Sequence, residues 1–272
     1  MKIDSPTEAD WQVFLDLAMA EGWRVPRREL ELYRGILAGG AFVLRRQGEP
    51  CGFVTAVPHE NSGWIGNLLV AASCRGRGYG NLLFDRALEF LRDRGMTSVW
   101  LTASQSGRPI YEKKGFQLVG GIERWTLVLD EPPMGTRSGA HGDFGSLCRG
   151  DCRIWGESRR SLLIPLARGG EVFSQGETSA LLQEGDGMRV LGPWVSETLC
   201  PRENRRVLLA ALASVPAGTE VVVDLLEGSP LSSLVTAAGF RRRGRSDLMV
   251  LGPCAGVDLR PLVALASLGS MG

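Results

Sequence analysis

The strongest candidate for chemistry is a glycine-rich turn in the first half of the chain, Arg75-Gly76-Arg77-Gly78-Tyr79-Gly80. Glycines at alternate positions let backbone N–H groups point into one concavity, which suits a diphosphate. The amphipathic segment that follows, residues 81–94, would add the positive end of a helix dipole, and Arg75 and Arg77 would add guanidinium donors. Tight connections without a ligand can have the same composition, so the turn alone leaves both interpretations open.

A tyrosine follows one strand and one loop later, in the segment Ser106-Gly107-Arg108-Pro109-Ile110-Tyr111-Glu112-Lys113-Lys114-Gly115-Phe116. A phenol on a short helix can donate a proton to a leaving group, or it can pack as a core side chain. Cys74 adjoins the glycine-rich turn, but no histidine is placed to activate its thiol, so we expect it to pack. The tyrosine is therefore the candidate for acid–base chemistry.

Together these segments resemble the signatures of the GNAT superfamily of N-acetyltransferases. The coenzyme A signature is Gln or Arg, two residues, Gly, one residue, then Gly or Ala, and Arg75, Gly78 and Gly80 fit it. The second signature, a tyrosine on a short helix before a Gly-Phe pair, is matched by Tyr111 and Gly115-Phe116. Likeness to tandem members of the superfamily extends over nearly the whole chain, at Trp64-Ile65-Gly66, Gly107-Arg108-Pro109 and Gly192-Pro193.

The resemblance implies an enzyme that binds acetyl-CoA as acyl donor and an amine as acceptor, with no metal. The strand over residues 64–70 would separate from its neighbour and bond the pantetheine arm like an added strand. A backbone N–H at the end of that strand would stabilise the oxyanion as the amine attacks, and Tyr111 would protonate the departing thiolate. The cofactor-binding residues that it implies are Leu68, Leu69, Val70, Arg75, Gly76, Arg77, Gly78, Tyr79, Gly80, Asn81, Ser104 and Gly107.

The general base is harder to place. Many members of the superfamily have a carboxylate on the strand before the glycine-rich turn, but residues 64–70 contain no acid. Glu60 and His59 lie just upstream in a loop and could act directly or through water, whereas Asn67 could only orient the acceptor. Glu60 and His59 are the candidate bases, with a solvated loop position as the alternative for both.

Apolar spacing predicts the elements that position these residues. Helical periodicity is found in residues 10–20, 27–37 and 81–94, and short apolar runs at 41–46, 51–57, 64–70, 98–101 and 124–129 are typical of strands. The order of these elements and the resemblance predict an α/β fold. We expect a mixed, mostly antiparallel central sheet flanked by helices in each of two GNAT-like domains.

The second half repeats the pattern of the first when it is shifted back by 124 positions. Gly239-Phe240 then falls on Gly115-Phe116, but Leu199–Asn204 falls on the glycine-rich turn and Val235 falls on Tyr111. We therefore expect a catalytic domain at 1–130, a linker at 131–145 that is rich in Pro and Gly, and a degenerate GNAT-like domain at 146–272. The last would form a wall of the acceptor site.

Composition limits the partners. The chain of 272 residues has 31 basic and 30 acidic residues, and its formal net charge of +1 does not favour a polyanion such as nucleic acid. The run Arg241–Arg245 is expected to be a solvated strand edge. Six scattered cysteines, no leader and no membrane-length apolar run favour a cytoplasmic protein with reduced thiols and no membrane partner.

The sequence is compatible with two other functions. The missing strand carboxylate is compatible with a non-catalytic sensor or interaction module that binds coenzyme A. A bulkier acyl-CoA could also replace acetyl-CoA, because Leu68 and Leu69 do not define the width of an acyl pocket. The sequence leaves the acceptor and the oligomeric state undetermined, since this fold serves many acceptors.

Overall fold

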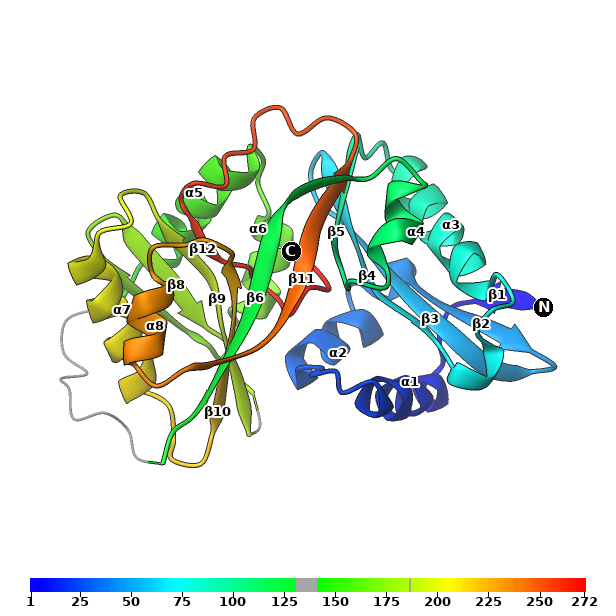
Figure 1. Ribbon diagram of the computed structural model, residues 1–272, viewed down its shortest axis with the longest axis horizontal. Coiled ribbons are helices and arrows are strands. Elements are labelled where there is room, and N and C mark those ends of the chain that lie inside the picture. The colour runs from blue at the N-terminus through cyan, green and yellow to red at the C-terminus, as the bar shows by residue number, and fades with distance from the viewer. Residues whose placement is uncertain (131–140, 186) are drawn as a thin grey trace.

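The computed structural model describes residues 1–130, 141–185 and 187–272 and has a mixed α/β fold (Figure 1). In these residues, twelve strands form one sheet in the order β1-β2-β3-β4-β5-β11-β6-β10-β12-β9-β8-β7. Among the strands of the described residues, only β4 with β5 and β9 with β10 pair in parallel. The predicted mixed, mostly antiparallel sheet flanked by helices is confirmed, although the two halves share one sheet.

The elements of the first half follow the predicted order. Apolar alternation forms the strands, and the helices bury one face against them. Their bounds are β1 (Lys2–Asp4), α1 (Glu8–Ala20), α2 (Arg27–Arg34), a 3-10 turn (Ala38–Gly40), β2 (Ala41–Arg46), β3 (Glu49–Pro58), β4 (Ser62–Val70), a second 3-10 turn (Ala72–Cys74), α3 (Tyr79–Arg92), β5 (Ser98–Ala103), α4 (Arg108–Glu112) and β6 (Gln117–Val128).

The second half begins with a well-capped helix. Residues 131–140 of the expected linker lie outside the described residues, and Asp143 near its end accepts hydrogen bonds from the N–H groups of Gly145 and Ser146 at 3.0 and 2.9 Å. The elements are α5 (Phe144–Trp155), α6 (Arg160–Leu166), β7 (Glu171–Gln175), β8 (Thr178–Leu182), β9 (Met188–Ser196), α7 (Pro201–Ala213), β10 (Glu220–Leu226), α8 (Ser232–Ala237), β11 (Arg241–Leu251) and β12 (Leu262–Ala264).

The halves exchange the strand that follows each Gly-Phe pair. β6 leaves the first half and pairs with β10, whereas β11 returns to the first half and lies between β5 and β6. Figure 1 shows β6 and β11 running side by side through the middle of the molecule. The predicted repeat is therefore interlocked, and neither half of the sheet is completed by its own strands alone.

Two features of β4 shape the surface next to it. β4 pairs with β5 only from Ser62 opposite Ser98 to Trp64 opposite Trp100, and beyond this point the two strands separate. Further along β4, the register with β3 shifts by one residue, and Asn67 has a positive φ of 51°. Such a bulge bends the strand and redirects its polar groups. The result is an open slot beside the end of β4.

The corresponding slot of the second half is filled by the chain itself. β9 and β10 pair in parallel only over Met188–Val190 and Glu220–Val222. β12 then lies between them, antiparallel to both. The two halves thus have like frameworks, but only the first has an open slot in its sheet.

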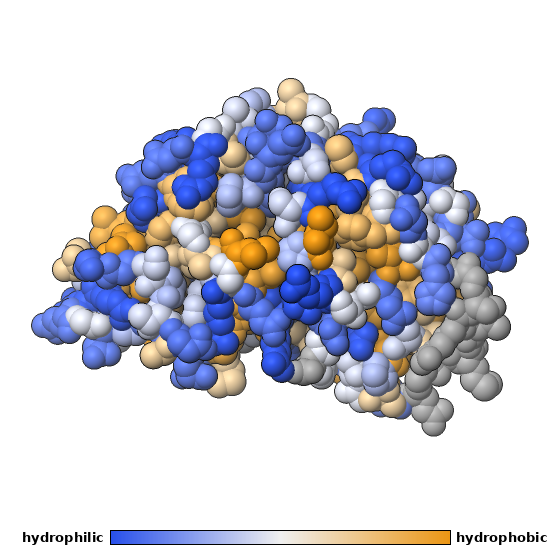
Figure 2. All heavy atoms as spheres, turned by 180° about the vertical axis from the view of Figure 1, so that it is seen from behind, coloured by the Kyte–Doolittle hydropathy of each residue, from blue (hydrophilic) through white to orange (hydrophobic). Residues whose placement is uncertain are grey.

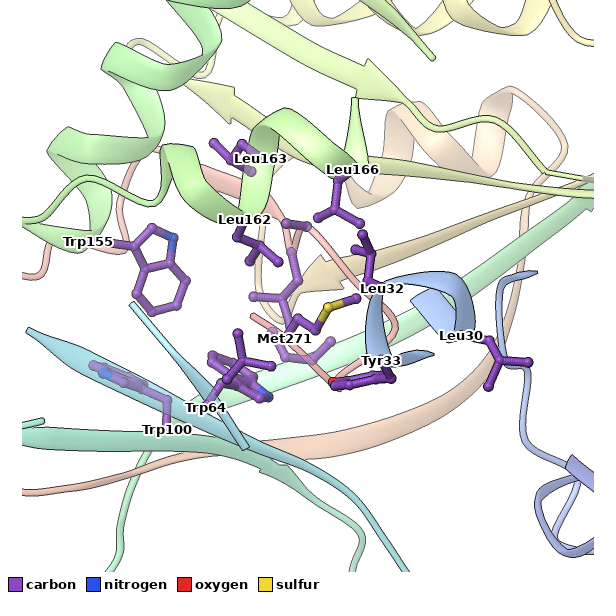
Figure 3. Close-up of a cluster of buried hydrophobic side chains, with 14 of the residues drawn as sticks. Leu30, Leu32, Tyr33, Trp64, Trp100, Trp155, Leu162, Leu163, Leu166 and Met271 are labelled. Carbon is purple, nitrogen blue, oxygen red and sulfur yellow. The ribbon is translucent and has the colours of Figure 1, made fainter. Parts of the chain in front are cut away.

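One core cluster joins the two halves. Figure 3 shows Trp64 and Trp100 of the first half facing Trp155, Leu162 and the other leucines of α6, with Met271 of the C-terminal segment among them. The Trp155 ring meets the rings of Trp64 and Trp100 edge to face, at 6.0 and 5.3 Å between centroids. The outer surface has a more polar composition than this core. On the face shown in Figure 2, small clusters of apolar residues lie among hydrophilic ones.

Candidate acyl-transfer site

The glycine-rich turn has the backbone that its composition predicts. Gly76 and Gly78 have positive φ angles of 73° and 79°, and Gly78 is the N-cap of α3. A Cβ atom at either position would meet nothing within 4 Å. These glycines are therefore needed for their conformation and for close access to the backbone, not for internal packing. Open space over a helix N-terminus fits a phosphate group.

The slot beside β4 opens into a cleft of about 770 Å³. Ile65, Gly66, Asn67 and Leu68 line it from β4, and Ser104 and Tyr111 line it from the opposite side. Its remaining walls come from the loop between α1 and α2, from β6, β10 and β11, and from the C-terminal segment Leu268–Ser270. The cleft therefore lies at the junction of the two halves, where residues of both face the end of β4.

The C-terminal segment closely approaches the bulged strand. A Cβ atom on Gly66 would lie 2.6 Å from the Cα of Ser270 and 2.5 Å from its carbonyl oxygen. The indole of Trp64 also donates a hydrogen bond to the carbonyl of Gly269 at 3.0 Å. Gly66 is therefore required because the backbone of the second half packs directly on β4 at this point.

A buried glutamate lies beside the bulge. Glu29 of α2 is 4% exposed and lines the cleft, and its Oε1 accepts a hydrogen bond from Asn67 Nδ2 at 3.3 Å. The same amide donates to Thr55 Oγ1, which donates to Tyr33 Oη, which donates to the carbonyl of Ser270. Burial raises the pKa of Glu29, outweighing the donors and positive charge nearby that lower it. Its carboxyl group can thus exchange a proton nearer to neutral pH than an exposed glutamate.

An ion pair forms the neighbouring wall. Arg124 on β6 lies opposite Asp224 on β10, and its Nε and Nη2 donate to the two carboxylate oxygens at 2.8 and 2.7 Å. Nη2 also donates to the carbonyl of Leu268 at 2.9 Å. Burial alone would lower the pKa of Arg124, but its bonds to Asp224 raise it, so the guanidinium stays charged. This pair exists only because β6 crosses to the second half.

The sequence model of the acetyltransferase (GNAT) family matches residues 10–116. These residues form a GNAT domain. No curated protein matches the sequence. In fold, the chain is similar to a candidate acetyltransferase of Pyrococcus horikoshii, with a TM-score of 0.84 and 20% identity over 100% of this chain and 95% of that one. It is also similar to a GCN5-related N-acetyltransferase of Sphaerobacter thermophilus, with a TM-score of 0.66 and 16% identity over 94% and 98%.

The tyrosine of the second signature faces the cleft of the GNAT domain. Tyr111 on α4 is half-buried, and its ring packs on Phe84 and Phe116 at centroid distances of 5.2 and 6.0 Å. Burial raises its pKa to about 12, so the phenol keeps its proton at neutral pH. A group in this state can act as a proton donor but not as a base.

The two residues expected as bases are not brought to the cleft. His59 and Glu60 lie in the turn between β3 and β4, at the end of β4 that is remote from Asn67. Glu60 is exposed and accepts a hydrogen bond from the N–H of Ser158 at 2.9 Å. Burial and the charge of Arg159 lower the pKa of His59 to about 3, and its ring nitrogens are buried without partners. Neither residue is therefore placed to act as a base in the cleft.

The arginine run is also placed differently from the expected solvated edge. Arg243 and Arg245 are exposed, but they line the cleft together with Gly244. Arg242 instead forms an ion pair with Glu123 at 2.6 Å. The bulge of β11 accounts for this division, because Arg242 and Gly244 pair with successive residues of β6 and Arg243 is the extra residue between them.

The sequence contained a pattern that indicates Glu29, but the carboxylate was expected on a strand and not on a helix. Leu30 and Tyr33 follow Glu29 by one and four positions, and all three residues are buried on the same face of α2. Acidic side chains are rarely buried, so an acid on the buried face of a helix indicates a candidate functional residue. Arg124 and Asp224 gave no comparable signal, because they meet only through the strand exchange.

Among the residues that the structure describes, no group of three or more His, Cys, Asp or Glu side chains could hold a metal ion. In the same residues, every helix is too short or too polar to cross a membrane.

Proposed function

We propose that this chain is an acetyl-CoA-dependent N-acetyltransferase that transfers the acetyl group directly to an amine. The observation that carries the proposal is the slot at the bulge of β4, which opens into a cleft lined by Glu29 and Tyr111. Backbone groups of Leu68 to Val70 would bond the pantetheine arm, and the turn with Asn81 at the start of α3 would bind the diphosphate. Ser104 and Gly107 would line the opposite side.

The side chains divide the proton transfers between them. In this proposal, Glu29 accepts the proton of the attacking amine, directly or through water, while Asn67 holds the carboxylate in place. Tyr111 donates its proton to the departing thiolate, and a backbone N–H near the bulge stabilises the oxyanion. Direct attack needs no covalent enzyme intermediate.

The second half would form a wall of the acceptor site without a cofactor site of its own. β12 fills the slot between β9 and β10, and the first turn of α7 contains Pro201 where the GNAT domain has its glycine-rich turn. This supports division into a catalytic domain at 1–130 and a degenerate GNAT-like domain at 146–272. The test of the overall proposal is release of free coenzyme A thiol from acetyl-CoA in the presence of a panel of amines. Absence of release with every amine would favour the sensor function.

We predict that Gly78→Val weakens acetyl-CoA binding at least about tenfold. A left-handed conformation costs a branched residue on the order of 1–2 kcal/mol, and its side chain would occupy the space above the turn. Titration calorimetry should also give one site per wild-type chain. Gly95→Val is the matched control, because Gly95 at the other end of α3 has a φ of 76° and open space around it. Equal losses in both variants would move the binding site away from the turn.

We predict that Tyr111→Phe lowers kcat by about 100-fold and leaves acetyl-CoA affinity nearly unchanged. The aromatic packing on Phe84 and Phe116 remains, whereas the proton donor is removed. Single-turnover rates and binding should be measured on the same preparation. Wild-type turnover in this variant would make Tyr111 a packing residue only.

A further inference from the structure

We propose that the acceptor is a small primary amine that also carries an anionic group, and that Arg243 binds this anion in the cleft. This inference rests on the proposed transferase function, and it assigns Arg243 to the specificity of the same site. The family match does not specify the charge of the acceptor.

The first support is the placement of Arg243 by a strand irregularity. In the pairing of β11 with β6, Arg242 lies opposite Trp125 and Gly244 lies opposite Arg124, which leaves Arg243 as the bulged residue. Its Nε donates to Thr126 Oγ1 at 3.2 Å, and Thr126 lines the cleft two residues from Arg124. Bulges commonly redirect a side chain next to an active site. Here the bulge puts a guanidinium on the cleft face of the sheet.

The second support is the balance of charge on the cleft wall. Arg24 pairs with Glu220 at 3.3 Å, and Arg124 pairs with Asp224. Arg245 is held by Glu227 and Asp247 at 2.7 and 2.5 Å. In the described part of the chain, Arg243 forms no such ion pair, and its Nη1 and Nη2 have no hydrogen-bond partner. A planar guanidinium of this kind suits a carboxylate or phosphate.

The third support is a pair of polar groups at the reaction end of the cleft. Ser270 and Glu29 are each 4% exposed and line the cleft, and the Ser270 hydroxyl is one of the donors that lower the pKa of Glu29. Ser270 belongs to the segment that packs on Gly66 of β4. The cleft thus offers a place for the acceptor amine at Ser270 and Glu29. The guanidinium of Arg243 offers a positive charge for the anionic group of the acceptor.

The test is direct binding of matched amines to the protein saturated with coenzyme A, measured by titration calorimetry. One pair is 4-aminobutyrate and 4-aminobutanamide, and the other is glucosamine 6-phosphate and glucosamine. The pairs distinguish a carboxylate from a phosphate as the recognised anion. We expect the anionic member of at least one pair to bind about tenfold or more tightly than its neutral partner.

Arg243→Gln should remove this preference by weakening binding of the anionic member to the level of its neutral partner. Arg242→Gln is the matched control, because Arg242 is the adjacent arginine paired with Glu123 outside the cleft. Equal or absent binding of anionic and neutral members, or an unchanged preference in Arg243→Gln, would overturn the inference. Titration of acetyl-CoA alone separates this outcome from failure of the proposed function, which predicts one acetyl-CoA site whatever the acceptor.

Discussion

Replacing Glu29 by glutamine is expected to lower kcat at least about 100-fold, because positioned general bases contribute rate factors of about 10² to 10⁴. The amide keeps the size of the side chain and can still accept the hydrogen bond from Asn67, but it cannot take a proton from the amine. We expect acetyl-CoA affinity to stay within about threefold of wild type, since Glu29 is not part of the turn that binds the phosphates. The measurement is kcat and acetyl-CoA affinity of the two proteins side by side.

The pH dependence provides a second measurement. Because burial raises the pKa of Glu29, the activity of the wild-type protein should increase as pH rises through that raised pKa, and Glu29→Gln should lose this part of the profile. Stability should change in the opposite direction. A raised folded pKa stabilises the protein below the unfolded pKa, and this contribution is lost as pH rises through the folded pKa. The melting temperature of Glu29→Gln at neutral pH should therefore be no lower than that of wild type.

Glu31→Gln is the control for the helix. Glu31 lies on the exposed side of α2, where it pairs with Arg28 at 3.0 Å, and exposed pairs of this kind contribute little. Its removal should change neither kcat nor the pH profile. Full activity of Glu29→Gln would place the base elsewhere and reduce Glu29 to a buried structural acid.

The parts of the site that depend on local sequence could be predicted. The glycine-rich turn needs left-handed backbone at Gly76 and Gly78, and Tyr111 is placed by a short helix that ends at Glu112, shortly before Gly115. Such features are fixed by a few neighbouring residues and leave a pattern in the sequence. The proposed base left a weaker pattern, an acid on a buried helical face, because Glu29 meets Asn67 only when α2 packs on the bulge of β4.

The fold was predictable to a similar degree. Hydrophobic spacing and the internal repeat indicated the strands and helices of both halves, because these periodicities are local. The pairing partners of β6 and β11 could not be predicted from such local patterns. A strand from either half could pair with the same edge of the sheet. Which strand does so depends on long-range packing that periodicity does not encode. The same holds for β12, whose three residues complete the sheet between β9 and β10.

This interlocking leads to the second large effect: a chain that ends after Asp143 should not fold. The truncation removes β11 from between β5 and β6 and removes β10, so β6 loses both of its neighbours. It also removes Trp155 and α6, against which Trp64 and Trp100 are packed. Loss of one buried aromatic side chain typically costs about 3–5 kcal/mol, and a whole domain is stable by only about 5–15 kcal/mol. The fragment should therefore aggregate or remain without cooperative unfolding, and it should not bind acetyl-CoA.

Expressing both parts together tests whether the defect is the missing strand or the cut itself. Residues 1–143 and 144–272 made as separate chains should associate, because β6 and β11 can still be exchanged between them, and the pair should regain one acetyl-CoA site. As a point variant, Met249→Lys in the full chain places a charge on β11 at a fully buried position packed against α3 and β5, and it should also lower the melting temperature steeply. A soluble fragment 1–143 that unfolds cooperatively and binds acetyl-CoA with wild-type affinity would contradict this account. In that case the GNAT domain could close its own sheet, and the strand exchange would serve only to build the acceptor wall through pairs such as Arg124 with Asp224.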